Sequence, residues 1–171
     1  MSFTFIKQLP SPDEVKSLEP MSEEMKQIKA GRDRLIQDVI TGASDKFLVI
    51  IGPCSADNED AVCEYTNRLA KVQEKVQDRL VLVPRIYTNK PRTTGEGYKG
   101  MLHQPDPEAK PDILAGILAI RHMHIRSIAE TGLTAADEML YPDNWHYLSD
   151  ILVGDRGARD RREGTREVGI R

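Results

Sequence analysis

The densest group of residues able to do chemistry lies in the segment from Arg85 to Gly100, RIYTNKPRTTGEGYKG, directly after the apolar run Leu80–Val83. Three cations, Arg85, Lys90 and Arg92, fall within eight positions, and two threonines and three glycines follow them. A guanidinium binds phosphate or carboxylate through a planar fork, lysine supplies a compact positive charge, and glycine lets the backbone approach a ligand closely. The segment therefore predicts a binding site for a small, multiply negative molecule.

Two further residues stand where an apolar run ends. Cys54 follows the run Phe47–Ile51 in the tetrapeptide Gly-Pro-Cys-Ser, and a cysteine there is either a small buried apolar side chain or a metal ligand or nucleophile. Glu138 lies near the end of the mostly uncharged run Leu133–Met139, where a carboxylate serves as an ion-pair partner or as an acid/base group. Cys63 falls inside an amphipathic helical pattern and is interpreted as packing.

The elements that must position these residues alternate between strand and helix. Helical periodicity and capping signals predict helices after Ser22 up to Gly42, from about Asn58, and over about 112–130 up to Gly132, with a short turn after Ser11 and a short helix over 142–152. Buried strands are predicted at 47–51, 80–83 and 133–139. Alternation of this kind indicates βαβ units and a parallel sheet, whose strands all end at one edge. We therefore expect Cys54, Arg85 and Glu138 to converge there, as in an α/β enzyme.

Composition and charge exclude several classes of protein. The formal net charge is −3, which argues against a nucleic-acid binder. No apolar run approaches the ~18 residues of a membrane span, and residues 1–20 are too polar for a signal peptide. The two cysteines form no disulfide framework, and the four histidines have no metal-ligand spacing, so we expect a reduced, cytoplasmic protein whose histidines are solvated or satisfied.

The chain divides into three parts by pattern. Residues 1–44 are predicted as an N-terminal extension of an arm and a helix, and residues 45–152 as the alternating α/β part. Residues 153–171 carry six arginines among four acidic residues and four glycines, with no helical stripe or buried strand. A basic tail for RNA or a phosphorylated partner is one interpretation; the interleaved acids favour a disordered end or a product that has left its reading frame.

The motifs together resemble the microbial class I 3-deoxy-D-arabino-heptulosonate 7-phosphate (DAHP) synthases. The resemblance rests on Gly-Pro-Cys-Ser at 52–55, on Arg85 with Lys-Pro-Arg-Thr-Thr at 90–94, on Gly-Tyr-Lys-Gly at 97–100, and on Thr-Gly-Leu at 131–133 leading to Glu138. It covers about residues 5–152 without an obvious gap.

The resemblance implies a (β/α)8 TIM barrel with an N-terminal extension, and a reaction that joins phosphoenolpyruvate to erythrose 4-phosphate in the shikimate pathway. It implies a divalent metal ion with Cys54 as one ligand. Arg85 and Lys90 would bind phosphoenolpyruvate, Arg92 and Thr93 would bind erythrose 4-phosphate, and Glu138 would lie near the phosphoenolpyruvate site. Lys90 and Glu138 would be the catalytic residues. A homo-oligomeric enzyme is expected.

The chain also departs from the family pattern. A complete barrel takes roughly 250 residues, and this chain has 171. Arg159 stands in a Gly-Ala-Arg triplet like one that binds phosphoenolpyruvate in the family, but about one residue early. The family's other metal ligands have no counterpart. We therefore expect the first half of a barrel with incompletely covered sheet faces, inactive alone; the alternative is a non-catalytic fragment that acts only as a binding or pairing module.

Overall fold

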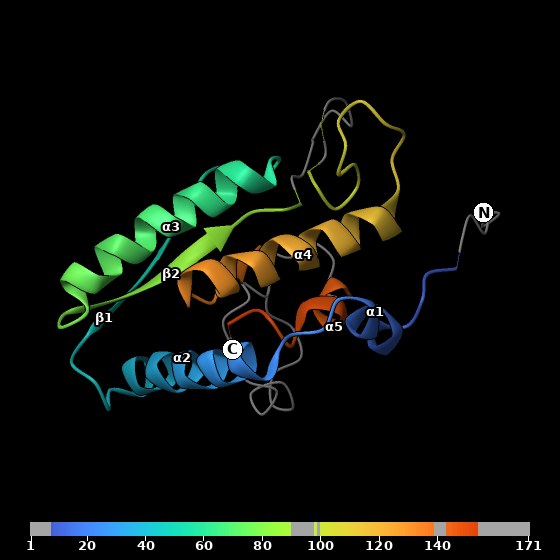
Figure 1. Cartoon of the computed structure of the whole chain (residues 1–171). Coiled ribbons are helices and arrows are strands. Elements are labelled where there is room, and N and C mark those ends of the chain that lie inside the picture. The colour runs from blue at the N-terminus through green and yellow to red at the C-terminus, as the bar shows by residue number, and fades with distance from the viewer. Residues whose placement is uncertain (1–7, 90–97, 99, 139–142, 154–171) are drawn as a thin grey trace, which may run out of the picture.

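The computed structural model describes residues 8–89, 98, 100–138 and 143–153. Eight helices and strands follow one another within these residues: α1 (Pro12–Leu18), α2 (Glu23–Thr41), β1 (Phe47–Ile51), α3 (Glu59–Val76), β2 (Leu80–Ile86), α4 (Ile113–Thr131), β3 (Ala136–Asp137) and α5 (Asn144–Leu148) (Figure 1). No helix in this described part has the length and apolarity that crossing a membrane requires. The order confirms the predicted alternation from β1 to β3.

The three long helices begin at about the predicted residues, and α2 and α4 also end there, because local groups satisfy their terminal peptide groups. Ser22, Asn58 and Asp112 each accept a hydrogen bond from a backbone N–H of the first turn of α2, α3 and α4. Gly42 and Gly132 end α2 and α4 in the left-handed conformation, which glycine adopts without steric cost. The shorter α1 starts at Ser11 with a capping box to Glu14.

The strands form one parallel sheet in the order β1-β2-β3. β1 pairs with β2 from Phe47 opposite Leu80 to Ile51 opposite Pro84, whereas β2 pairs with β3 only at Arg85–Ala136 and Ile86–Asp137. β2 is longer than predicted, and β3 is much shorter than the expected 133–139. The predicted helix 142–152 is likewise reduced to α5, after which turns place Ile151 and Leu152 in the core.

Side chains explain why β3 begins so late. The N–H of Phe47 donates to the carbonyl of Arg79, so the odd-numbered peptide groups of β2 face β1 and the even-numbered groups face β3. Before Ala136, the side chain of Gln73 in α3 occupies the edge of β2 that β3 would pair with. Its amide donates to Leu80 O at 2.9 Å and accepts from Leu82 N at 2.6 Å. Arg32 of α2 donates to Leu82 O, and the next even residue is a proline without an N–H. Hence no ladder bond remains for residues 133–135.

Helices cover both faces of this sheet (Figure 1). Ile36 of α2 packs against Val81 and Val83 of β2, while Leu69 of α3 packs against Leu82 on the other face. The expectation of incompletely covered faces is therefore wrong for β2. It is right for β1, where Phe47 and Ile51 are 74% and 45% exposed. Val153, the first residue of the predicted tail, is also buried, and its N–H donates to Ala135 O.

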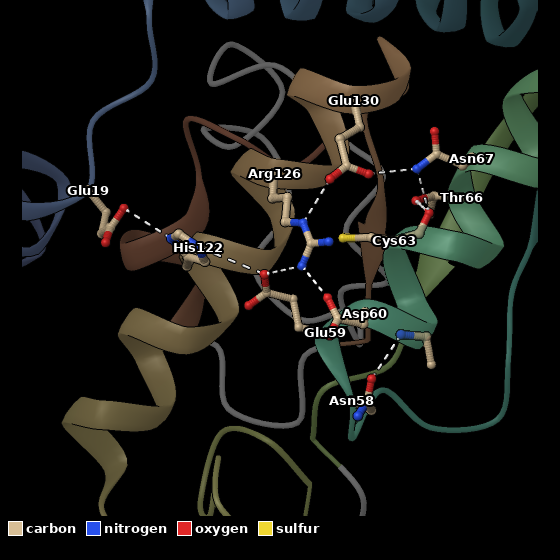
Figure 2. Close-up of polar contacts among 11 residues, drawn as sticks. Glu19, Asn58, Glu59, Asp60, Cys63, Thr66, Asn67, His122, Arg126 and Glu130 are labelled. Atoms are coloured by element: carbon tan, nitrogen blue, oxygen red, sulfur yellow. Dashed lines mark hydrogen bonds and ion pairs between the residues drawn. The ribbon is translucent and has the colours of Figure 1, made fainter.

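A polar cluster ties α3 to α4 on the outer surface (Figure 2). Arg126 of α4 donates to Glu59 and Asp60 at the start of α3 and to Glu130 one turn along its own helix. These bonds raise the pKa of Arg126, so it stays charged at any ordinary pH. His122 lies one turn before Arg126, between Glu19 and Glu59, which confirms the prediction of a solvated histidine.

A second arginine ties the N-terminal segment to the end of the described chain. Arg121 is fully buried and donates to Glu19 O, to Tyr147 O and to both carboxylate oxygens of Asp150. Burial by itself would raise the pKa of Asp150, but the bonds from Arg121 outweigh it and the pKa lies below its ordinary value. The guanidinium thereby joins α1, α4 and α5 at one point.

The replacement of strand pairing by Gln73 is testable. Gln73→Ala should lower the free energy of unfolding by about 1–3 kcal/mol, because the carbonyl of Leu80 and the N–H of Leu82 lose the partner that Gln73 supplies. Gln77→Ala is the matched control, since Gln77 lies four positions along, is exposed, and bonds only within its own turn to Glu74 O. Urea unfolding of both variants measures the difference. Equal losses would show that the Gln73 amide contributes nothing specific.

Candidate functional site

The three predicted site residues among the described ones lie past or at the carboxyl ends of the three strands. Cys54 follows β1, Arg85 is the last residue but one of β2, and Glu138 follows β3. Because all strands are parallel, these ends share one edge of the sheet. The convergence expected from the sequence is met most directly by Arg85 and Glu138, which are in contact.

Arg85 and Glu138 form an ion pair. Nε of Arg85 donates to Oε2 of Glu138 at 3.0 Å and Nη2 donates to the same oxygen, while Nη1 donates to Pro53 O at 3.2 Å. The guanidinium carbon also lies 4.5 Å from the ring centroid of Tyr87. The side chains of Arg85 and Glu138 remain 31% and 41% exposed, so solvent and ligands reach them. Of the two roles left open for Glu138, the structure gives it the ion pair.

The Gly-Pro-Cys-Ser segment packs directly against β2. A Cβ on Gly52 would lie 1.8 Å from the carbonyl oxygen of Arg85, so only glycine allows this approach. Beyond it, the N–H of Ala56 donates to Tyr87 O at 2.8 Å. The segment thereby holds Pro53 O against the guanidinium of Arg85 and carries Cys54 at the same edge.

Cys54 and Cys63 have opposite environments. Cys54 is exposed, whereas Cys63 is 1% exposed within α3. Burial raises the pKa of the Cys63 thiol to about 11, which confirms the prediction that Cys63 is a packing residue. Within the described residues, no three His, Cys, Asp or Glu side chains gather as metal ligands would. Cys54 is therefore a single accessible thiol at the edge of the sheet.

Burial and the neighbouring carboxylate of Glu138 raise the pKa of Tyr87. Its hydroxyl is protonated at neutral pH, so Tyr87 adds no negative charge beside the guanidinium of Arg85. The ring presents an apolar face with a negative quadrupole to that cation. Tyr87 thus helps to fix the orientation of Arg85 while leaving its outward N–H groups for an anion.

Below this pair lies a buried polar group that sequence reasoning missed. Asp137 accepts hydrogen bonds from Thr88 and from the backbone of Glu138, and His124 of α4 faces it. Beside it is a cavity of about 10 Å³, lined in part by Asn89, whose buried Nδ2 has no hydrogen-bond partner among the described residues. A cavity of this size holds about one water molecule. The sequence signal for this group was Asp137 itself, an acidic residue within the mostly uncharged run Leu133–Met139.

The remaining predicted site residues, Lys90, Arg92, Thr93 and Arg159, lie outside the described residues, so their roles stay predictions. The described part of the site is an arginine held from three sides, by a carboxylate, a carbonyl and an aromatic ring. Its guanidinium has five N–H donors, of which three bond to described residues. The other two can bind a phosphate or carboxylate group.

Residues 20–165 match the model of the DAHP synthetase I family. The chain is 34% identical over 158 residues to the Tyr-sensitive phospho-2-dehydro-3-deoxyheptonate aldolase of Escherichia coli, covering 92% of this chain and 44% of that protein. It is 37% identical over 123 residues to the phenylalanine-inhibited aldolase of Saccharomyces cerevisiae, covering 71% of this chain and 32% of that one.

The fold is similar to the structure of the phospho-2-dehydro-3-deoxyheptonate aldolase from Francisella tularensis, with a TM-score of 0.79 and 24% identity. That match covers 94% of this chain and 48% of the other. The chain thus spans less than half the length of the relatives it matches.

The contrast between the two thiols gives a direct test of the site's exposure. Iodoacetamide at neutral pH should modify Cys54 and leave Cys63 unmodified in the folded chain, because Cys63 is buried and its pKa is raised to about 11. Peptide mass mapping before and after unfolding in urea measures both. Modification of Cys63 at the same rate as Cys54 would contradict the packing of α3.

Proposed function

The chain belongs to the DAHP synthetase I family, and from that premise we propose that it forms the N-terminal part of a synthase that condenses phosphoenolpyruvate with erythrose 4-phosphate. In this proposal β1, β2 and β3 are the first strands of a (β/α)8 barrel, and the carboxyl edge of the sheet is the active-site rim. The observation that carries the proposal is the Arg85–Glu138 pair at that edge, held against the Gly-Pro-Cys-Ser segment.

Phosphoenolpyruvate fits the described part of this site by its chemistry. It carries a phosphate and a carboxylate, and each matches the planar N–H fork of a guanidinium. We propose that Arg85 binds it through the two N–H donors that the pair leaves available. The ion pair with Glu138 fixes the orientation of the Arg85 guanidinium. It also lowers the net positive charge of the site, so that an anion binds reversibly.

The second substrate is also an anion, so bringing both together requires several cations to offset their Coulomb repulsion. We propose that Lys90 contacts phosphoenolpyruvate and that Arg92 and Thr93 bind erythrose 4-phosphate. These residues follow β2 directly in the sequence, and Asn89, the last described residue before them, is 3% exposed. In this proposal the buried Asn89 fixes the point at which the segment that carries Lys90 and Arg92 begins.

The family resemblance implies a divalent metal, and Cys54 is the described residue whose chemistry suits one. Its thiol is exposed at the rim, and thiolates are strong ligands for first-row divalent metals. The described residues supply this one ligand and no group of three, so by themselves they do not make a metal site. We propose that Cys54 is one ligand of a site completed by residues beyond the described ones, and no reaction step is derived through the metal.

One observation favours a second candidate function. The outer edge of β1 pairs with no described strand, and Phe47 beside it is 74% exposed. An exposed edge strand with apolar side chains is a template for pairing with another strand. The alternative is therefore a non-catalytic fragment that acts only as a pairing module, with no affinity for either substrate.

Calorimetric titration separates the two candidates. The 171-residue chain should bind phosphoenolpyruvate without turning it over, and Arg85→Ala should weaken binding by about tenfold or more, since a charge-assisted hydrogen bond contributes about 1.5–3 kcal/mol. Arg68→Ala is the matched control, because Arg68 pairs with Glu64 on the exposed surface of α3. A pairing module would show no heat of binding in the unsubstituted chain, and equal affinities for both variants would remove Arg85 from the site.

Protection of the thiol tests the metal proposal. Excess Co²⁺ should slow alkylation of Cys54 several-fold, because a metal-bound thiolate is a weaker nucleophile than a free one. Cys54→Ser identifies the labelled position, and the near-ultraviolet absorption of a cobalt–thiolate bond gives an independent readout that should vanish in the same variant. An alkylation rate that is independent of cobalt would show that Cys54 is not a ligand in this chain.

A further inference from the structure

We propose that Asp137 is a positioning residue whose buried carboxylate joins the ends of β2 and β3 and thereby holds Arg85 and Glu138 in contact on the opposite face of the sheet. The proposal rests on the proposed function only where it assigns substrate binding to that pair. Asp137 itself lies beneath the rim and has no direct access to a substrate, being 2% exposed.

The carboxylate contacts both strand ends at once. Oδ1 accepts from the backbone N–H of Thr88 at 3.2 Å and from the backbone N–H of Glu138 at 2.7 Å. Oδ2 accepts from the hydroxyl of Thr88. One side chain thus binds the residue two positions after the end of β2 and the residue directly after β3.

These bonds join the strand ends beyond the point where the backbone ladder stops. The last pair of the β2–β3 ladder is Ile86–Asp137. In a longer ladder the next bond would run from the N–H of Thr88 to Glu138 O. The N–H of Thr88 donates instead to Oδ1 of Asp137, the oxygen that also accepts from the N–H of Glu138. The strands can therefore separate at the rim, where Arg85 and Glu138 need room, while their ends stay joined.

The buried position explains why an acceptor is required there. Burying a carboxylate is costly unless donors surround it, and Asp137 has three donors and His124 Nε2 at 3.8 Å on the side of α4. An apolar side chain at 137 would remove the oxygen that the N–H groups of Thr88 and Glu138 share, and the buried N–H of Thr88 would lose its acceptor there. A carboxylate or a side-chain amide satisfies both.

The effect reaches the site through the alternation of side chains along a strand. Asp137 points toward the face of the sheet that α3 and α4 cover, with Ile86 opposite it, and Glu138 points toward the other face, as Arg85 does. Because the Arg85 Nε–Glu138 Oε2 bond is 3.0 Å long, a backbone shift of about 1 Å at Glu138 would break it. Fixing the N–H of Glu138 therefore fixes the pair.

Nuclear magnetic resonance of the 171-residue chain tests the proposal without any ligand. Asp137→Ala should speed exchange of the Thr88 and Glu138 amides and of the Arg85 Nε–H by about tenfold, the effect of losing one hydrogen bond of ordinary strength. Asp137→Asn should restore values close to the parent's, because its Oδ1 can accept from both amides and its Nδ2 can donate to Thr88 Oγ1.

Ser127→Ala is the control for general destabilisation. Ser127 is buried between α3 and α4, where it bonds to Thr66, so this variant should lower the melting temperature and leave the Arg85 Nε–H signal unchanged. Unchanged exchange in folded Asp137→Ala, or equal damage in Asp137→Asn, would overturn the proposal. An exchange rate of the Arg85 Nε–H that changes in step with the melting temperature across all three variants would also overturn the proposal.

One measurement holds even if Asp137→Ala does not fold. In the parent chain, a coupling across the hydrogen bond should link the Thr88 amide nitrogen to the side-chain carboxylate carbon of Asp137. Its absence would overturn the proposal. Failure of the parent to bind phosphoenolpyruvate would instead count against the proposed function, and the exchange and coupling results would still decide the role of Asp137.

Discussion

The brevity of the pairing between β2 and β3 is the constraint on which the candidate site depends. Only two residue pairs, Arg85–Ala136 and Ile86–Asp137, join these strands. That ladder places Arg85 opposite Ala136, two positions before Glu138 and on the same face of the sheet, so the ion pair at the rim follows from strand register. A slip by one residue would turn Glu138 toward the face covered by α3 and α4 and Asp137 toward Arg85, because alternate side chains face opposite sides of a sheet.

At both ends of the short β2–β3 ladder, polar side chains bond to peptide groups in and just after β2 that have no partner on β3. Before it, the amide of Gln73 and the guanidinium of Arg32 bond to the free peptide groups of β2. After it, Asp137 bonds to both strand ends. The same physical requirement, that buried peptide groups be paired, acts in both places. It is met by helix residues on one side and by the strand's own side chain on the other.

Local signals made much of this fold predictable. Ser22, Asn58 and Asp112 cap the long helices, Gly42 and Gly132 end two of them, and each acts on residues within one turn of itself. β1 and β2 follow from continuous apolar runs. The bounds of β3 could not be derived this way, because they depend on Gln73, which lies more than sixty positions earlier in the chain. Likewise Asp137 meets Thr88 only through the register of two strands that are 49 positions apart.

Arg121 has a consequence for how the protein is made. Its guanidinium is the point at which the segment after α1 meets α5, through Glu19 O on one side and Tyr147 O and Asp150 on the other. A ribosome adding about 5–20 residues each second needs on the order of ten seconds to pass from Glu19 to Asp150. During that interval α2 can already pack against β2, but α1 has no completed partner surface. The docking of α1 is therefore a late event of synthesis.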